Sequence, residues 1–201
     1  MSTPGHFLLK LRPAPLASML AAVAGLSKRR LVTTPMGTFF INPISNFGAA
    51  ILRGEYEPQM VRVLSRYLSP GGVFIDIGAN EGYFSVLASR LVGRKGTVVA
   101  IEPQSRLQSV IRTTLEANDC YNVRLFKCAV ADRTVKMRLS LAPNSNSGSS
   151  SFFRSTKYIL PTEEVQAFCL VDLFERIGVD CCDLIKVDIE GGRVRRVYAS
   201  R

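Results

Sequence analysis

The segment Val73-Phe-Ile-Asp-Ile-Gly-Ala-Asn-Glu-Gly-Tyr-Phe-Ser85 joins a short apolar run to a helical pattern through a turn that contains glycine. A short apolar run of this kind is typical of a strand buried on both faces of a parallel sheet. Gly78 and Gly82 permit a tight turn and let the backbone approach a ligand closely. The segment therefore predicts a strand–turn–helix unit with a ligand site at the carboxyl end of the strand.

Two ligands suit a turn of this kind. A nicotinamide dinucleotide rests its pyrophosphate on such a helix N-terminus, but its fingerprint is G-x-G-x-x-G, and this loop has Gly78 and Gly82 alone. The carboxylates of Asp76 and Glu81 are expected to repel a pyrophosphate and to suit a ligand that bears an ammonium and a sulfonium. The loop therefore favours S-adenosylmethionine (SAM). An NAD-dependent oxidoreductase is the weaker alternative, and an ordinary junction capped by Asn80 is a third.

Glu102 ends the next apolar strand along the chain. An acidic residue in this place accepts hydrogen bonds from ribose hydroxyls in nucleoside sites. NAD sites share this feature, so Glu102 indicates a nucleoside without choosing between the two cofactors.

Strands and helices alternate on both sides of this unit. We expect strands at 73–77, 97–101, 123–130 and 184–189, and helices at 58–68, 83–92, 106–118 and 171–177. Helices of this length between strands imply parallel crossovers and therefore an α/β, Rossmann-like sheet with both faces covered. A hairpin is expected at 31–34 and 38–42, and further strands at 135–141 and 165–170 on either side of a polar loop at 143–151.

Composition sets bounds on the function. With 201 residues, 47% of them hydrophobic and 21% charged, the chain is long enough for one globular domain. Its net charge of +10 is concentrated in part at residues 28–30 and 193–201, without the interleaved aromatic residues of a nucleic-acid surface. We therefore expect no nucleic-acid partner.

Few side chains are available for metal or nucleophilic chemistry. The five cysteines lack C-x-x-C spacing and the only histidine is His6, so we expect reduced thiols and no metal site. The apolar stretch 14–26 is shorter than the roughly 20 residues that span a bilayer, and its basic cluster follows it, which is the wrong order for a signal peptide. We expect an N-terminal helix, no stable membrane insertion and a cytoplasmic location.

Five segments resemble, in order, the FkbM family of class I methyltransferases; they lie at 54–58, 74–83, 100–103, 129–132 and 183–191. The resemblance covers about residues 31–192. It implies SAM as methyl donor and methylation of a hydroxyl on a small molecule or saccharide. It also implies a role for particular residues: a SAM loop lined by Asp76, Gly78, Asn80 and Gly82, a ribose contact at Glu102 and an adenine contact at Asp132. Glu57, just before a helix, is a candidate to reach the SAM end of the pocket, and a helix-dipole or capping role is equally open.

The last matching segment supplies candidate catalytic residues. Alternation along a strand places Lys186, Asp188 and Glu190 on one side, towards the carboxyl end of the sheet. Asp188, or secondly Glu190, is a candidate general base that takes the proton from the acceptor hydroxyl. A lysine–carboxylate pair that only orders the site is the alternative. A divalent metal on the two acidic residues lacks an evident third ligand.

The resemblance divides the chain into an N-terminal helical extension (1–30), a partial methyltransferase domain (31–192) and a basic tail (193–201) that matches nothing in the family. A complete domain of this class would continue with further strands, so we expect a chain shortened by truncation or an altered reading frame. The strand at 184–189 is then expected at an exposed sheet edge. Both an O-methyltransferase and a non-catalytic SAM- or nucleoside-binding remnant remain open.

Overall fold

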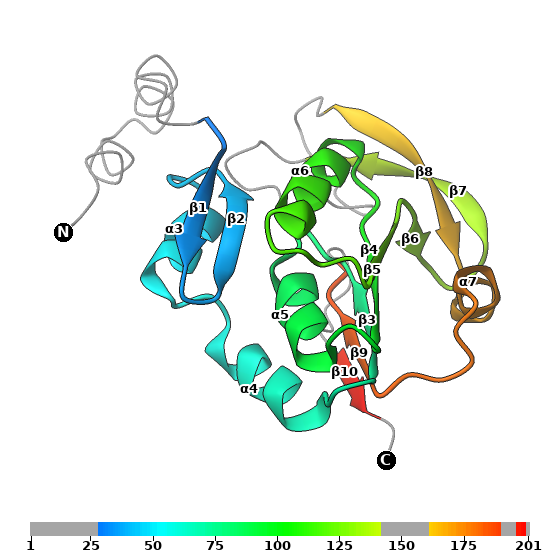
Figure 1. Cartoon of the computed structure of the whole chain (residues 1–201). Coiled ribbons are helices and arrows are strands. Elements are labelled where there is room, and N and C mark those ends of the chain that lie inside the picture. The colour runs from blue at the N-terminus through cyan, green and yellow to red at the C-terminus, as the bar shows by residue number, and fades with distance from the viewer. Residues whose placement is uncertain (1–27, 142–160, 190–195, 200–201) are drawn as a thin grey trace.

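A five-stranded sheet forms the centre of the computed structural model, which describes residues 28–141, 161–189 and 196–199 (Figure 1). Its strand order is β10-β9-β3-β4-β5. The strands are β3 (Val73–Ile77), β4 (Thr97–Ile101), β5 (Val123–Phe126), β9 (Leu184–Val187) and β10 (Arg196–Ala199). All neighbouring pairs are parallel except β9 and β10, which are antiparallel. The predicted α/β, Rossmann-like fold is confirmed.

Helices cover both faces of this sheet because its central strands are apolar on both sides. Phe74 packs on the side of α5 (Tyr83–Val92) and α6 (Ser105–Glu116). Ile75 and Ile77 point to the opposite side, where α7 (Leu170–Ile177) contributes Leu173 and Ile177 to a second core. The alternation of β3 between two cores is the pattern expected of a strand in a covered parallel sheet.

A hairpin of β1 (Arg30–Thr34) and β2 (Gly37–Ile41) precedes the sheet and packs on α6 (Figure 1). Phe39 and Ile41 are buried beneath it. The chain then forms α3 (Asn46–Arg53), whose first turn is capped by Ser45 and which was not predicted, and α4 (Pro58–Tyr67). These elements agree with the predicted hairpin and with the predicted helix at 58–68.

A small separate sheet shows that the single strand predicted at 123–130 is wrong. The chain leaves the central sheet after Phe126, and β6 (Ala129–Val130) pairs with β8 (Thr162–Phe168), which in turn pairs with β7 (Val135–Ser140). The buried alanines Ala129 and Ala167 lie opposite each other in this ladder, so a compact apolar contact holds the sheet together. The predicted strands at 135–141 and 165–170 both belong to this sheet.

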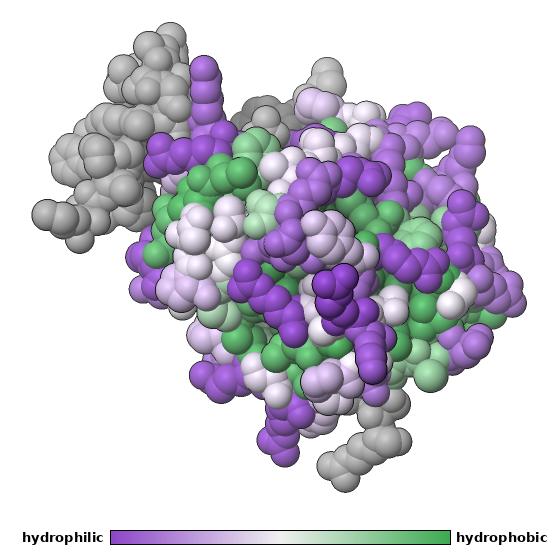
Figure 2. Space-filling model, viewed as in Figure 1, coloured by the Kyte–Doolittle hydropathy of each residue, from purple (hydrophilic) through white to green (hydrophobic). Residues whose placement is uncertain are grey.

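The expectation that the strand at 184–189 lies at an uncovered edge is also wrong. The backbone of β10 pairs antiparallel with β9, so main-chain groups on that edge of β9 have partners. The helix expected at 14–26 and the polar loop at 143–151 lie outside the described residues. None of the helices in the described ranges is long and apolar enough to cross a membrane. Figure 2 shows hydrophilic and hydrophobic residues interspersed over one face of the molecule.

Candidate functional site

The loop between β3 and α5 has the tight turn that its glycines predict. Gly78, Asn80 and Gly82 all have positive φ, at 80°, 52° and 84°. A Cβ atom on Gly78 would lie 2.0 Å from the carbonyl oxygen of Asp188, so only glycine fits there. This contact brings the cofactor loop directly beside the segment that follows β9.

Backbone donors of the loop are used inside the protein. The N–H groups of Gly78 and Ala79 donate to the carbonyl of Ile101 at 2.9 and 3.0 Å. The N–H of Asn80 donates to Glu102 Oε2 at 2.9 Å, and that of Gly82 donates to the carbonyl of Ala79 at 2.9 Å. A loop that binds pyrophosphate presents such groups to the phosphate oxygens. These four N–H groups are therefore not available to phosphate oxygens, although none of them belongs to the first turn of α5.

Asp76 lies beneath the loop in a buried ion pair with Lys186. Lys186 Nζ donates to Asp76 Oδ1 at 3.0 Å and to the carbonyl of Gly78 at 3.1 Å. Ser85 Oγ, from the first turn of α5, donates to Asp76 Oδ2 at 2.7 Å. The Asp76 side chain is 0% exposed and that of Lys186 is 7% exposed. The pair therefore holds β3, β9, the loop and α5 together from below.

The structure describes two of the three candidate catalytic residues, Lys186 and Asp188. Lys186 is turned into the interior, where it pairs with Asp76. Asp188 follows β9 and is half-buried, and its N–H donates to the carbonyl of Ile77 at 2.9 Å. Glu190 lies outside the described residues. The ordering role of the lysine, given above as an alternative, is the arrangement that this geometry favours.

Glu81 is the second carboxylate of the loop, and its charge is also paired. Arg29 donates to it through Nη1 at 2.6 Å and through Nη2 at 2.8 Å. The Glu81 side chain is 1% exposed. Because each acidic side chain of the loop has a cationic partner, their repulsion of a pyrophosphate is offset, and that reason for preferring SAM was wrong.

Glu102 lies at the carboxyl end of the sheet, just past β4. Its Oε1 accepts from the N–H of Gln104 at 3.0 Å, and its Oε2 accepts from the N–H of Asn80. Burial raises the pKa of Glu102 from 4.5 to about 7, although these two hydrogen bonds lower it in part. One buried carboxyl group thus joins the loops that follow β3 and β4.

Glu57 follows Tyr56, whose ring contacts the start of α5. The ring of Tyr56 packs against the rings of Tyr83 and Phe84, with centroids 5.3 and 5.6 Å apart. Glu57 itself has φ 41° and precedes α4, but its side chain makes no capping hydrogen bond. A side-chain capping hydrogen bond is therefore not found, and the contact of Glu57 with the cofactor stays a prediction. A non-glycine residue at positive φ is a feature that clusters at functional sites.

Asp132 is exposed and follows β6, in the small sheet rather than the central one. An adenine contact by this residue remains a prediction. Within residues 28–141, 161–189 and 196–199, no three His, Cys, Asp or Glu side chains are grouped in a way that could hold a metal ion.

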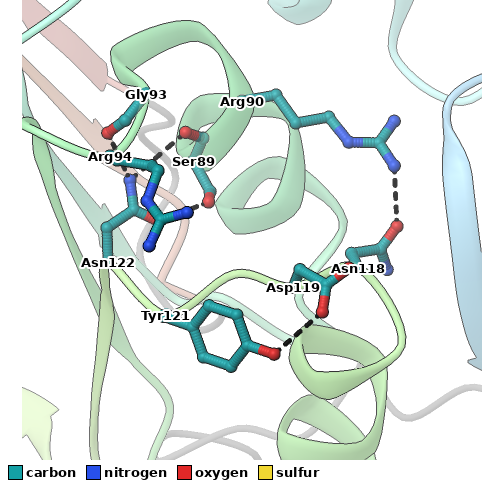
Figure 3. A pocket seen from close by; sticks show the side chains of 8 residues that line it. All are labelled: Ser89, Arg90, Gly93, Arg94, Asn118, Asp119, Tyr121 and Asn122. Atoms are coloured by element: carbon teal, nitrogen blue, oxygen red, sulfur yellow. Dashed lines mark hydrogen bonds between the residues drawn. The ribbon is translucent and has the colours of Figure 1, made fainter.

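A hollow of about 430 Å³ lies at the opposite end of α5 (Figure 3). Its lining residues are Ser89, Arg90, Gly93, Arg94, Asn118, Asp119, Tyr121 and Asn122. Several of them bind one another: Arg90 donates to Asn118, Tyr121 to Asp119, and Asn122 to the carbonyls of Ser89 and Gly93. The hollow is distant from the loop. Several of its polar groups are used in hydrogen bonds within the protein, which is a structural role.

Sequence patterns missed Arg29 and Gln104. Arg29 is far from Glu81 along the chain, so no local spacing signals their pairing. Gln104 is buried beside Glu102 and accepts hydrogen bonds from Arg106 Nε and Nη2 at 2.9 and 2.7 Å. The one sequence signal for Gln104 is its position two residues after Glu102, the glutamate expected to bind a ribose.

Replacing Asp76 tests the buried pair. We expect Asp76→Asn to lower the free energy of unfolding by about 3–5 kcal/mol, because it leaves the Lys186 ammonium buried without its anion. Glu55→Gln is the matched control, since its pair with Arg53 is exposed and contributes less than about 1 kcal/mol. Urea denaturation measures both. Equal small losses in the two variants would contradict a supporting role for the pair.

The pH dependence of stability tests the environment of Glu102. Its pKa is raised in the folded chain, so the unfolded chain loses this proton first as the pH rises. The Glu102 contribution therefore lowers the free energy of unfolding between about pH 4.5 and about pH 7, by up to roughly 3 kcal/mol. Denaturation of the native chain and of Glu102→Gln across this range isolates that slope. Parallel profiles for the two proteins would show that Glu102 ionises in the ordinary way.

Comparisons with known proteins agree with the predicted family. The family model described as the methyltransferase FkbM domain matches residues 76–192. The uncharacterized protein YpiP of Bacillus subtilis (strain 168) is 34% identical over 97 residues, which are 47% of this chain and 37% of that protein. The chain thus spans well under half the length of the relative that it matches.

Two solved structures are similar to part of this chain. A SAM-dependent methyltransferase from Aquifex aeolicus is 22% identical, with a TM-score of 0.34, over 43% of this chain and 48% of that one. TYW2 of M. jannaschii, in complex with AdoMet, is 17% identical, with a TM-score of 0.40, over 50% of this chain and 43% of that one. These likenesses are partial. The family match covers more than half of the chain, and the chain therefore belongs to the FkbM-domain methyltransferase family.

Proposed function

We propose that this chain is a SAM-dependent methyltransferase domain, with its cofactor lying over residues 78–82 at the carboxyl end of β3 and β4. The observation that carries the proposal is the FkbM-domain match, which begins at Asp76 and contains the whole loop. The strained turn and the glutamate after β4 lie where an open α/β sheet places its ligands.

The residues present fit this cofactor. Glu102 accepts a backbone N–H on each oxygen and a further hydrogen bond from the Gln104 side chain, and its remaining acceptor capacity is assigned to a ribose hydroxyl. Gly78 lets the loop pack directly against the backbone of Asp188, which brings the proposed base next to the loop assigned to SAM. Glu57, beside the start of α5, is assigned to the ammonium of the methionine part. Asp132 is assigned to the adenine.

The chain's own groups then position the acceptor and move one proton. When bound, SAM would supply a methyl group activated by its positively charged sulfur, and the O–CH₃ bond would form as the S–CH₃ bond breaks, with S-adenosylhomocysteine as the leaving product. Asp188, held beside Gly78, takes the proton of the acceptor hydroxyl. Lys186 holds the loop through Gly78 and takes no proton. Most of the rate comes from alignment.

The acceptor that we assign is a hydroxyl on a small molecule or saccharide, with Glu190 as the second candidate base. A domain that binds SAM without transferring the methyl group is the other function compatible with the same residues. Cofactor binding is therefore the first step to test, and an acceptor screen follows it.

Calorimetric titration of the chain with S-adenosylhomocysteine, and separately with NADH, tests the cofactor. We expect the first ligand to bind and Glu102→Gln to weaken it by about tenfold to a hundredfold, since hydrogen bonds to a charged group contribute roughly 1.5–3 kcal/mol. Glu116→Gln, an exposed acidic residue on α6, is the matched control and should bind normally.

Each outcome has a distinct meaning. Binding of NADH alone would overturn the proposal in favour of the oxidoreductase. No binding by the folded chain would also overturn it. Binding of S-adenosylhomocysteine that is unchanged in Glu102→Gln would leave the cofactor assignment standing and refute the ribose contact.

A further inference from the structure

We propose that Arg29 is a positioning residue of the cofactor site and that, through it, the β1–β2 hairpin is part of that site. The family match begins at residue 76, so neither Arg29 nor the hairpin belongs to the matched domain. The identity of the ligand rests on the proposed function, whereas the contact between Arg29 and the loop is a feature of the structure itself.

The buried carboxylate of Glu81 requires a partner of opposite charge. Glu81 lies in the cofactor loop, and its side chain is 1% exposed. A charged group so far from water is strongly unfavourable unless it is paired and hydrogen-bonded. Without its partner, this carboxylate would turn towards water, and the loop would have to rearrange around it.

Arg29 is that partner, and its geometry also fixes the orientation of the Glu81 carboxylate. Its two terminal nitrogens donate to the two carboxylate oxygens at 2.6 and 2.8 Å, a bidentate arrangement that restricts both groups. Nη1 also donates to the carbonyl of Phe40 on β2 at 3.3 Å. The Arg29 side chain is 20% exposed, so most of it is packed between the hairpin and the loop.

The hairpin is itself held in place by α6. The N–H of Phe40 donates to Thr114 Oγ1 at 3.1 Å, and the N–H of Thr38 donates to Asn118 Oδ1 at 3.0 Å. Phe39, between them, is buried in the core shared with α5 and α6. The hairpin that carries Arg29 is therefore held in place by α6 and the core, independently of the loop.

The neighbours of Glu81 explain why its position bears on the cofactor. Asn80 and Gly82, on either side of it, both have positive φ, and the N–H of Asn80 binds Glu102. Holding Glu81 in place thus maintains the left-handed turn on both sides of it and the connection to the proposed ribose carboxylate. Burial lowers the pKa of Arg106, and the nearby charges of Arg29, Glu102 and Glu81 also act on it, which places these groups in one neighbourhood.

Four variants separate positioning from general stability. Arg29→Met removes the cation, and Arg30→Met changes an exposed neighbour on β1 as the control. Glu81→Gln removes the buried charge, and the double variant Arg29→Met/Glu81→Gln removes both. Amide hydrogen exchange of the ligand-free chain reports on residues 78–82. Calorimetry with S-adenosylhomocysteine reports on binding.

We expect Arg29→Met to speed exchange at Ala79 and Asn80 and to weaken binding about tenfold, with most of both effects reversed in the double variant. Arg30→Met should match the native chain. Unchanged exchange in Arg29→Met, equal effects of Arg30→Met, or no recovery in the double variant would each overturn the proposal. If the native chain does not bind S-adenosylhomocysteine, the proposed function fails, whereas the exchange data still decide the role of Arg29.

Discussion

The buried pair of Lys186 and Asp76 is the interaction on which the rest of the site depends. The two residues are direct partners in the register of β9 and β3, so the pair forms only when these strands are aligned. The same ammonium group also binds the carbonyl of Gly78, and Ser85 binds the same carboxylate. Buried charge requires partners in defined places. One ion pair therefore sets the strand register, the course of the cofactor loop and the start of α5.

The loop that results is constrained from several directions and carries little net charge. Lys186 offsets one of its carboxylates from below, and Arg29 offsets the other from the hairpin. Several of its backbone donors bind groups inside the protein, including Glu102. Such a loop presents a backbone surface held by internal hydrogen bonds and ion pairs, with the carboxyl group of Glu102 beside it. These features are consistent with the nucleoside cofactor proposed above.

Local patterns predicted the elements whose residues carry a local signal. The strands at 73–77 and 97–101 and the helix at 83–92 agree with the structure because apolar runs and glycine turns define them. The strand at 123–130 was wrong because apolar residues continue after the chain has left the sheet. The partner strand β10 was missed because its residues show no apolar run. Glu102 was predicted from its place after a strand, whereas Arg29 meets Glu81 only through the folded hairpin.

The most direct test of the account is where the cofactor product binds. Amide chemical shifts of the ¹⁵N-labelled chain, followed by nuclear magnetic resonance during titration with S-adenosylhomocysteine, give this residue by residue. The account predicts that the largest changes occur at residues 78–82 and 102–104 and at Asp188, around the carboxyl ends of β3, β4 and β9. Changes confined to the hollow at 89–94 and 118–122, or an unaltered spectrum, would contradict it.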